Sequence, residues 1–514
     1  MTKLKLRPLA IVPTQWARAL LASFCLALTG CATDALTHAP ASPNEPWQPP
    51  LQNVAASHPT QPAPIAPSDF SVPSLPEASI LPSAPAIDNK HVYSLPELID
   101  LAQRENPETR LAWNRARQAA LAIGIAEATF LPMLSANVIG GWQKTHTPLP
   151  LLPGNQSIDT ELHGVVPALA LEWLIFDFGQ RRAIADGARQ VSFAANVLFN
   201  GAHQKIIHDV THAFYQYGAA RSQIDIAAQT LKNSRFIAQA VQERRKAGLA
   251  TVVETAQANQ LVAQAKLRQV NAQGLEHTAY QALLAAVGLP PAARIKVSLP
   301  SDRPLPDTNT TLTDEAIQLA LSRRPDVLAS YATAKAAQAG ITAAEAEFLP
   351  KVYLGAVAAR SHTNFAANGL PSLHQQTGSS SVLLGLTIPI FDGGLRSARL
   401  KDAQIQADKA TDTLRQLQQS AMREMIAASD MLRSALASYH AASELARTTA
   451  TVYDATLEAY RHGAGTLTAA TEATNALLDA RQARMEARTA SQTAAANLAF
   501  VMGAMTTPRD TWID

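Results

Sequence analysis

The sequence predicts a mainly α-helical chain with four short β-strands, arranged as two tandem copies of one unit. One observation behind this prediction is a set of long alanine-rich runs without proline, which indicate helices longer than a compact globular domain uses. The other is that one succession of motifs occurs twice along the chain. Both copies are therefore expected to fold in the same way.

Paired motifs at constant spacing define the two copies. At an offset of 215 residues the pairs are Ile175-Phe176-Asp177-Phe178-Gly179 with Ile390-Phe391-Asp392-Gly393-Gly394, Arg245 to Gly248 with Tyr460 to Gly463, and Val287-Gly288 with Met502-Gly503. At an offset of 218 residues Phe130-Leu131-Pro132 pairs with Phe348-Leu349-Pro350. The change of offset indicates a three-residue length difference between Pro132 and Ile175.

One helix of unusual length is predicted in the first copy. About 65 residues from Gln180 to Ala247 contain no proline, which gives a rod of about 100 Å at 1.5 Å per residue. Apolar residues recur along it with the seven-residue spacing of a coiled-coil seam, and alanines lie between them. The seam consists of Val210, Tyr217, Ile224 and Leu231 with Ala213, Ala220 and Ala227. It predicts close packing of helix against helix.

Residues 1–30 are predicted to be a lipoprotein signal peptide. Basic residues precede an apolar run of about ten residues, Ala19 to Leu28, which is half of what a bilayer requires. The run ends in Leu28-Thr29-Gly30-Cys31, which resembles the bacterial lipobox; the alternative is an ordinary signal peptide with a chance cysteine. Residues 31–90 hold thirteen of the 32 prolines, a composition that predicts an extended tether.

Charge and cysteine content exclude several classes of function. Removal of residues 1–30 takes away four basic residues and leaves 39 basic against 41 acidic residues, so no basic excess points to nucleic acid. Cys25 is lost with the leader and Cys31 would carry lipid, so the mature chain has no thiol for a disulfide or a metal site. No cofactor is expected beyond covalent lipid on Cys31.

Two β-like segments separate the helices in each copy. The hairpins are expected at about residues 133–175 and 351–391, and the second loop from Asn364 to Gly378. Their alternation of polar and apolar residues is typical of transmembrane strands, although a soluble hairpin packed on a helix shows it too. Four strands cannot close a membrane barrel, because single-chain barrels begin at eight strands and open edges leave backbone groups unpaired in lipid. Several protomers must therefore pool their strands if these span a membrane.

In this order and duplicated, the motifs resemble the TolC family of outer-membrane channel-tunnels over about residues 92 to 508. The resemblance implies a homotrimer in which each protomer gives four strands to a shared 12-stranded barrel and its helices to a long periplasmic α-barrel. It implies the outer-membrane channel of a tripartite efflux or secretion system, with a periplasmic adaptor (membrane fusion) protein and an inner-membrane pump of the RND or ABC type as partners. The lipid anchor resembles drug-efflux members, whereas the Phe-Asp-x-Gly turns resemble TolC itself, so type I protein secretion stays an alternative.

The resemblance completes the expected domain organisation and location. The domains are a signal peptide at 1–30, a lipidated tether at 31–90, a first repeat at 91–300, a second repeat at 301–508 and a C-terminal tail at 509–514. The expected location is the outer membrane, in contact with its lipid, with a lipid anchor and a periplasmic helical extension.

The resemblance also implies a periplasmic gate where the long helices turn. Glu254 stands where the family prototype has an aspartate, and Tyr460 matches the tyrosine that bonds to that acid. Glu472 matches one pore-facing acid, but Ala469 replaces the second acid and Gly465 replaces an arginine. The plain alternative is that Glu254 and Glu472 are first-turn acids favoured by the helix dipole. The adaptor is expected to contact the two turns, at Gly248, Leu249, Gly463 and Gly465.

Two other classes of function compete with a channel. His208 and His212 lie four residues apart on one predicted helix face, loosely like a zinc-protease helix. Asp209 replaces the usual glutamate there and no third ligand is evident, so no enzyme activity is expected. A lipidated periplasmic coiled-coil adaptor or scaffold would have one helical hairpin flanked by β-domains, whereas here two long hairpins alternate with short β-hairpins.

Overall fold

The computed structural model describes residues 76–79, 87–148, 157–299, 305, 312–367 and 371–505 of the 514-residue chain. The chain divides into two units, Met1–Ser83 and Ala84–Asp514. Of the first unit, the structure describes the short 3-10 helix η2 (Pro76–Ser79). The predicted signal peptide, the predicted lipidation site Cys31, most of the predicted tether and the tail at 509–514 lie outside the described residues.

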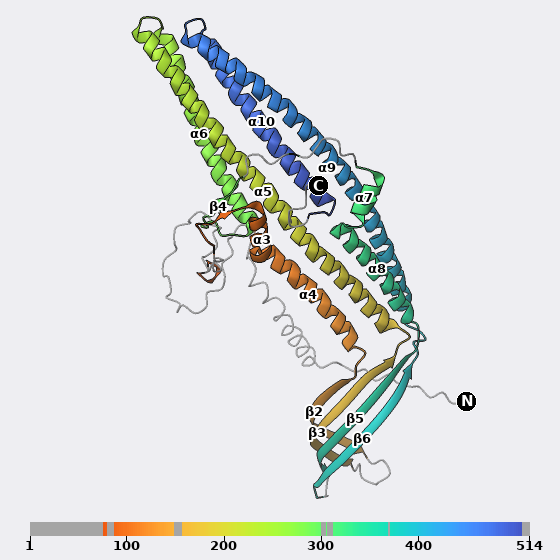
Figure 1. Ribbon diagram of the computed structural model, residues 1–514. Coiled ribbons are helices and arrows are strands. Elements are labelled where there is room, and N and C mark those ends of the chain that lie inside the picture. The colour runs from red at the N-terminus through yellow and green to blue at the C-terminus, as the bar shows by residue number, and fades with distance from the viewer. Residues whose placement is uncertain are drawn as a thin grey trace, which may run out of the picture. The chain divides into compact units, whose positions relative to one another are not determined.

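The second unit contains both predicted copies, each with a shorter helix, a β-hairpin and a long helical hairpin (Figure 1). The first copy consists of β1 (Val92–Tyr93), α3 (Leu95–Glu105), α4 (Pro107–Ala128), β2 (Met133–Pro148), β3 (Ser157–Phe176), α5 (Gln180–Lys246), α6 (Val252–Val287) and β4 (Lys296–Val297). The second copy consists of α7 (Asp314–Leu321), α8 (Pro325–Ala346), β5 (Lys351–Ala367), β6 (Leu373–Thr387), α9 (Leu395–Arg461) and α10 (Leu467–Val501). Helices α5 and α9 each have 67 residues, which confirms the predicted long helix and its repetition.

Local signals in the sequence set the ends of the shorter helices. The Glu97 carboxylate accepts a hydrogen bond from the Ser94 N–H at 2.7 Å and so closes the start of α3. Asn106 ends α3 and caps α4, because its side chain accepts from the Glu108 N–H at 2.9 Å. Pro107 then occupies the first position of α4, where no backbone donor is needed.

The four longer strands form one antiparallel sheet in the order β2-β3-β5-β6. The central pair, β3 with β5, joins the two copies and places Leu171 opposite Ala356. The second hairpin lies where it was predicted, but its strands are longer, because β5 and β6 continue through most of the segment expected to be a loop from 364 to 378. Thr363 still pairs there with Gln375. Ladder bonds between backbones need no apolar side chains, so this extension leaves no alternating pattern in the sequence.

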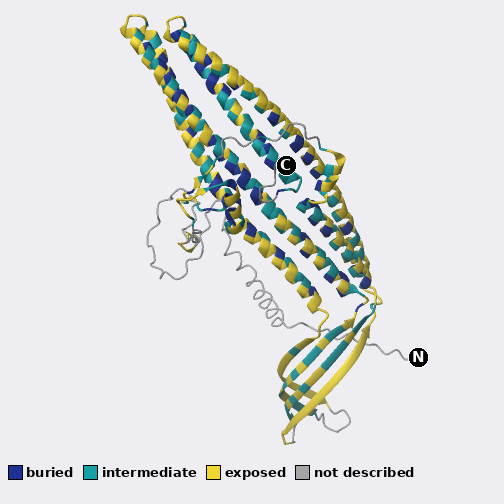
Figure 2. Cartoon of the chain, viewed as in Figure 1, coloured by how far each residue is buried: buried dark blue, intermediate teal, exposed yellow. Residues whose placement is uncertain are grey.

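The two outer strands present open edges. Figure 2 shows β2 and β6 exposed along almost their whole length, whereas β3 and β5 contain many half-buried residues. Val138 on β2 and Val382 on β6 are 71% and 73% exposed. An unpaired strand edge with apolar side chains is a template for another strand.

Helix α5 is the centre of the helical part and packs against α4, α6, α8 and α10. Its predicted seam is confirmed, since six of the seven seam residues are buried and Ile224 is half-buried. Small alanines in the seam allow helix backbones to approach one another closely. None of the helices in the described part of the chain is both long and apolar enough to cross a membrane.

A compact cluster sits at the level where α3 covers α5 and α6. Leu98, Ile99, Val210 and Leu283 are fully buried in it. Strands β1 and β4 pair in parallel beside the cluster, with Tyr93 opposite Val297 and the Ser298 N–H donating to the Tyr93 carbonyl at 2.8 Å. This small sheet was not predicted, because strands of two residues carry no periodic signal.

Candidate functional site

The first helical tip joins α5 to α6 through a tight turn. Gly248 has a φ of +73°, and the Leu249 N–H donates to the Arg244 carbonyl at 2.8 Å, which closes the end of α5. Thr251 caps α6 by accepting from the Glu254 N–H at 3.1 Å, and the Glu254 carboxylate accepts from the Thr251 N–H at 2.6 Å. The hydrogen bonds from Thr251 hold the pKa of the Glu254 carboxyl below its ordinary value.

The second tip, between α9 and α10, repeats this turn with different side chains. The Thr466 hydroxyl accepts from the Ala469 N–H at 3.2 Å, but Ala469 has no carboxylate to return the bond, so the capping box is incomplete. Gly465 packs against the preceding backbone, and a Cβ atom there would lie 3.0 Å from the Tyr460 nitrogen. The arginine of the family prototype therefore does not fit this position unless the backbone shifts.

Tyr460 belongs to α9 but lies in a core shared by both helical hairpins. Its side chain is 2% exposed. The core around it consists of Ile237 and Val241 of α5, Ala258 and Leu261 of α6, and Leu467 and Ala470 of α10. Burial raises the pKa of its phenol; the positive charge of Arg244 opposes this rise, and the negative charge of Glu254 adds to it.

The expected hydrogen bond between Glu254 and Tyr460 is not formed. The Tyr460 hydroxyl is buried and has no hydrogen-bond partner within the described residues. The Glu254 carboxylate is already bonded to both the N–H and the hydroxyl of Thr251. A local capping bond costs little conformational entropy, so it competes well with a more distant partner.

Arg244, which the sequence analysis did not single out, joins the two tips. Its guanidinium donates to the Tyr460 carbonyl at 3.3 Å and lies 5.3 Å from the centroid of the Tyr460 ring. Basic residues in the last turn of a helix usually interact with the carbonyls of that same helix end. The sequence around Arg244 therefore gave no sign of a contact with the other hairpin.

Glu472 and the apolar residues of the first tip face outward. The Glu472 side chain is exposed beyond the first turn of α10, which begins at Leu467, so the alternative that it is a first-turn acid is wrong. It has no hydrogen bond or ion pair to the residues that the structure describes. Leu249, Val252 and Val253 are 67%, 67% and 65% exposed. The first tip thus combines a rigid turn with an uncovered apolar surface.

These structural features belong to a known family. The profile of the family described as "Outer membrane efflux protein" matches residues 98–289 and 316–504, one segment in each copy. The chain belongs to the outer membrane efflux protein family. The match confirms the resemblance that the duplicated motifs indicated.

Individual relatives agree with the assignment. Outer membrane protein OprJ of Pseudomonas aeruginosa is 31% identical over 66% of this chain and 70% of its own length. SilC of Salmonella typhimurium, described as a probable outer membrane lipoprotein, is 24% identical over 73% of this chain and 78% of its own. The crystal structure of a membrane protein from Pseudomonas aeruginosa is 26% identical and covers 84% of this chain and 99% of that chain, with a TM-score of 0.69. This outer membrane efflux protein is an outer-membrane efflux channel.

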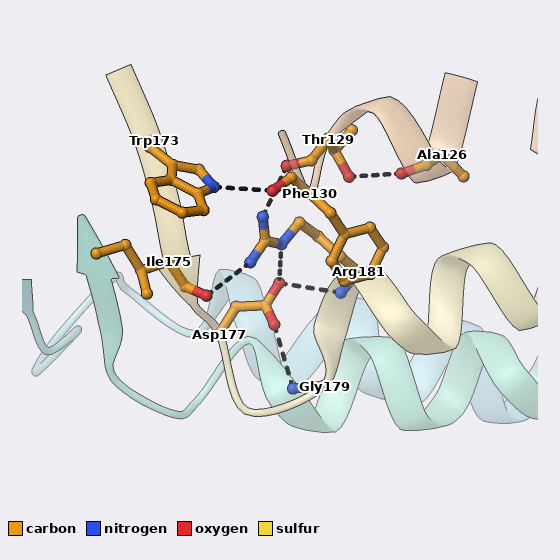
Figure 3. A network of polar contacts seen from close by, with 8 residues as sticks. All are labelled: Ala126, Thr129, Phe130, Trp173, Ile175, Asp177, Gly179 and Arg181. Carbon is orange, nitrogen blue, oxygen red and sulfur yellow. Dashed lines mark hydrogen bonds and ion pairs between the residues drawn. The ribbon is translucent and has the colours of Figure 1, made fainter. Parts of the chain in front are cut away.

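In this outer membrane efflux protein the junction between β3 and α5 is a closed polar network (Figure 3). The Asp177 carboxylate accepts from the Arg181 N–H at 3.0 Å and from its Nε at 2.7 Å. The guanidinium also donates to the carbonyls of Thr129 at 2.7 Å and Ile175 at 3.3 Å. Burial acts to raise the pKa of Asp177, but the hydrogen bonds and charge of Arg181 outweigh it and leave the pKa below its ordinary value.

The second junction, between β6 and α9, repeats the ion pair in an open setting. The Arg396 Nε lies 2.5 Å from the Asp392 carboxylate, and the guanidinium donates to the Pro389 carbonyl at 2.9 Å. Beside it, Ile390 and Phe391 are 93% and 89% exposed. The ion pair is therefore formed, whereas the apolar residues of the segment between β6 and α9 are uncovered.

The histidine pair on α5 is part of helix packing. The rings of His208 and His212 are 6.2 Å apart, and the His208 ring lies 4.7 Å from that of Phe500 on α10. The His208 Nδ1 is 3.1 Å from the Asp209 carboxylate. No group of three or more potential metal ligands occurs in the described part of the chain.

Proposed function

We propose that this outer membrane efflux protein works as a homotrimer that receives substrates from a periplasmic adaptor protein and an inner-membrane pump of the RND or ABC type. The observation that carries the proposal is that α5 and β3 of the first copy are packed against the second copy, whereas the equivalent α9 and β6 are less covered. Within the chain, α8 packs on α5 and β5 pairs with β3. The equivalent faces of α9 and β6 have no such partners within the described residues, and a second chain can supply them through its α4 and β2.

Exposed apolar residues on α4 support this arrangement. Leu111, Leu121 and Ile125 are 56%, 69% and 71% exposed. At the 218-residue offset they correspond to Ala329, Ala339 and Ala343 of α8, which are buried or half-buried. Ala329 packs against Ala194 of α5. The large exposed side chains of α4 thus lie at the positions equivalent to those at which α8 packs against α5. Helix α9 of another subunit can cover them.

The repeat also gives a register for the strands at the subunit boundary. Leu171 of β3 pairs with Ala356 of β5. Adding 215 to the first number and subtracting 218 from the second gives Leu386 of β6 opposite Val138 of β2 in the partner subunit. Such pairing closes both open edges, as backbone groups in lipid require.

Cysteine crosslinking tests the assembly. A Cβ atom at Gly187 of α5 would lie 3.8 Å from the Ala339 Cβ of α8, a distance that suits a disulfide. The equivalent pair across the proposed boundary is Asp402 of α9 with Leu121 of the partner subunit. We expect the double variant Asp402→Cys, Leu121→Cys to form covalent dimers and trimers on oxidation in membranes.

The matched control is the double variant Gly187→Cys, Ala339→Cys. It should form its disulfide within one chain and keep the mass of a monomer on a non-reducing gel. If Asp402→Cys, Leu121→Cys also stays monomeric while the control oxidises fully, the proposed boundary between subunits is wrong. Reconstituted protein that never conducts ions in planar bilayers would contradict the channel itself.

The helical tips are the proposed adaptor-contacting and gating end. The turns at Gly248 and Gly463, with the neighbouring Leu249 and Gly465, present the exposed apolar surface that an adaptor can cover. Three copies of Glu472 would form an acidic ring at the constriction, with Glu254 and Tyr460 behind it. Glu254 contributes there through its charge and its cap rather than through a bond to the phenol.

The anchor is the last part of the proposal. Cys31, which follows the lipobox-like Leu28-Thr29-Gly30, would carry the lipid that holds the tether at the outer membrane. The Cys31→Ser variant should lose metabolic palmitate labelling and keep its signal peptide longer. Equal labelling of the variant and the wild type would contradict the proposed lipid anchor on Cys31.

A further inference from the structure

We propose that Arg244 is the latch that holds the two helical tips of one subunit together, and that the closed state of the channel depends on it. The inference rests on the channel function proposed above. Arg244 is a positioning residue here: it fixes the tips relative to each other and contacts no substrate.

The two partners of this contact are divided between the two copies of the repeat. At the offset of 215 residues, Arg244 corresponds to Ala459, and Arg245 corresponds to Tyr460. The first copy therefore has the arginine and lacks the tyrosine, while the second copy has the tyrosine and lacks the arginine. Neither hairpin can form the arginine–tyrosine contact alone, and the fold brings the two partners together from different hairpins.

Arg244 contacts Tyr460 in two ways, at its backbone carbonyl and at its aromatic ring. The Arg244 guanidinium donates to the Tyr460 carbonyl at 3.3 Å and lies over the ring at 5.3 Å. It is the one hydrogen bond that links the two tips within the described residues. A cation over an aromatic face that is largely shielded from water is attracted more strongly than one at an exposed site.

The Arg244 guanidinium lies beside the turn of the second tip. A Cβ atom at Gly463 would lie 3.6 Å from the Arg244 guanidinium, and Gly463 has a φ of +80°. At Gly465 a Cβ atom would already crowd the Tyr460 backbone. Gly463 is therefore explained by its positive φ and Gly465 by the close backbone, and the guanidinium of Arg244 packs beside this turn.

A reciprocal contact lies nearby but is weaker. The Arg461 guanidinium of α9 lies 5.7 Å from the ring of Phe236 on α5, and that ring is 44% exposed. Arg461 is also paired with Glu458 of its own helix at 3.1 Å. Water and the competing carboxylate weaken this second contact, so Arg244 is the principal link.

The latch uses the ring and the carbonyl of Tyr460 but not its hydroxyl, which has no hydrogen-bond partner among the described residues. This detail separates the latch from a gate that depends on a bond between Glu254 and the phenol. Tyr460→Phe should leave the latch closed, whereas Tyr460→Leu removes the aromatic face and should weaken it.

Single-channel recording in planar bilayers tests the latch. The Arg244→Ala variant should raise the ratio of open to closed time by about three- to tenfold, because a hydrogen bond from a charged donor is lost from a partly shielded site. Arg244→Lys keeps the charge without the planar fork and should lie between Arg244→Ala and the wild type. The matched control is Arg245→Ala, which removes the adjacent, exposed arginine and should behave like the wild type.

A distance measurement tests the same contact without any current. Spin labels on Leu249→Cys and Ala464→Cys, both at exposed positions of the tips, should report one short distance in the wild type. Arg244→Ala should lengthen and broaden that distance with little change of thermal stability. If the Arg244→Ala variant has the same open time and the same label distance as the wild type, the proposed latch is wrong. A protein that forms no channel in any variant would contradict the proposed function instead.

Discussion

The two strand-to-helix junctions carry the same motif and the same ion pair, yet they differ in their surroundings. In the first junction the side chains of Arg181 and Asp177 are 9% and 6% exposed. In the second junction those of Arg396 and Asp392 are 12% and 26% exposed, and the connecting residues Ile390 and Phe391 beside them are exposed. The ion pair is thus a local product of the sequence, whereas its exposure depends on the residues packed around it.

The difference shows that, in the part of the chain that the structure describes, a single chain leaves its second junction without a neighbour that its first junction has. Glu347 at the end of α8 reaches both copies, since it lies 3.4 Å from the Gln180 amide and 3.3 Å from the Arg399 guanidinium. The first junction therefore has neighbours on both sides, while the second has a neighbour on one side within the described residues. A subunit that packs on α9 would make the two junctions equivalent.

The largest expected effect comes from the buried ion pair. Arg181→Ala leaves the Asp177 carboxylate buried without its partner, which should cost about 3–5 kcal/mol of stability. Arg396→Ala should cost clearly less in dissociated monomer but approach the same loss in the proposed trimer, where a neighbouring subunit would cover it. Thermal melting of both variants in monomeric and trimeric detergent preparations checks this. Equal losses in the monomer would contradict the difference in cover.

A charged side chain on α4 breaks the proposed boundary. Leu121→Lys should leave the monomer folded but prevent the trimer, because each subunit loses the burial of one leucine, about 1.5–3 kcal/mol, and must bury a charge. Ala339→Lys at the equivalent position of α8 should instead disturb folding within the chain. Size measurement in mild detergent distinguishes the two, and a stable Leu121→Lys trimer would argue against this interface.

Acid should weaken both junctions. The pKa values of Asp177 and Asp392 lie below the ordinary value in the folded protein, so their contribution to stability is present above about pH 4 and is lost as the pH falls through the lowered pKa values. Glu97, with its pKa lowered to about 2, acts in the same direction at the start of α3. The exposed Asp392 pair is screened by solvent and salt, so it should contribute less of the pH dependence than the Asp177 pair. Melting temperatures between pH 6 and pH 3 should therefore fall less steeply for Asp177→Asn, which keeps only the exposed pair, than for Asp392→Asn. The reverse order would show that the second junction is the better shielded one.

A smaller effect distinguishes the two tips. Thr251→Ala should cost about 1–2 kcal/mol, because it breaks a complete capping box, whereas Thr466→Ala should cost about 1 kcal/mol at most. Hydrogen exchange of the first turns of α6 and α10 measures each loss locally. The same loss at both tips would mean that the Glu254 carboxylate adds nothing to the cap.

The last prediction affects conduction alone. Glu472→Gln should lower the cation preference of single channels and leave stability unchanged, because an exposed ring of like charges favours cations at a constriction. Reversal potentials in a salt gradient measure the preference. If the preference stays the same, Glu472 lies on the outside of the helical wall and plays no part in the gate.

The sequence by itself determined the elements and their repetition. A long proline-free run in which apolar residues recur every seven positions, with alanines between them, indicates a long packed helix. Asp177 and Arg181, like Asp392 and Arg396, are close enough in the chain to pair locally. The glycine turns and threonine caps are likewise local, since each depends on residues within one turn. These features were predictable because local hydrogen bonding and side-chain periodicity act over a few residues.

The tertiary structure alone decided which residues meet across the copies. Arg244 and Tyr460 are 216 residues apart, and nothing near either one specifies the other. The family resemblance predicted that Glu254 bonds to Tyr460, but its carboxylate accepts hydrogen bonds from Thr251, three residues away. The polar extensions of β5 and β6 were missed because ladder bonds leave no side-chain pattern. Contacts between distant segments depend on how helices and strands pack, and this packing has no signature at the level of single residues.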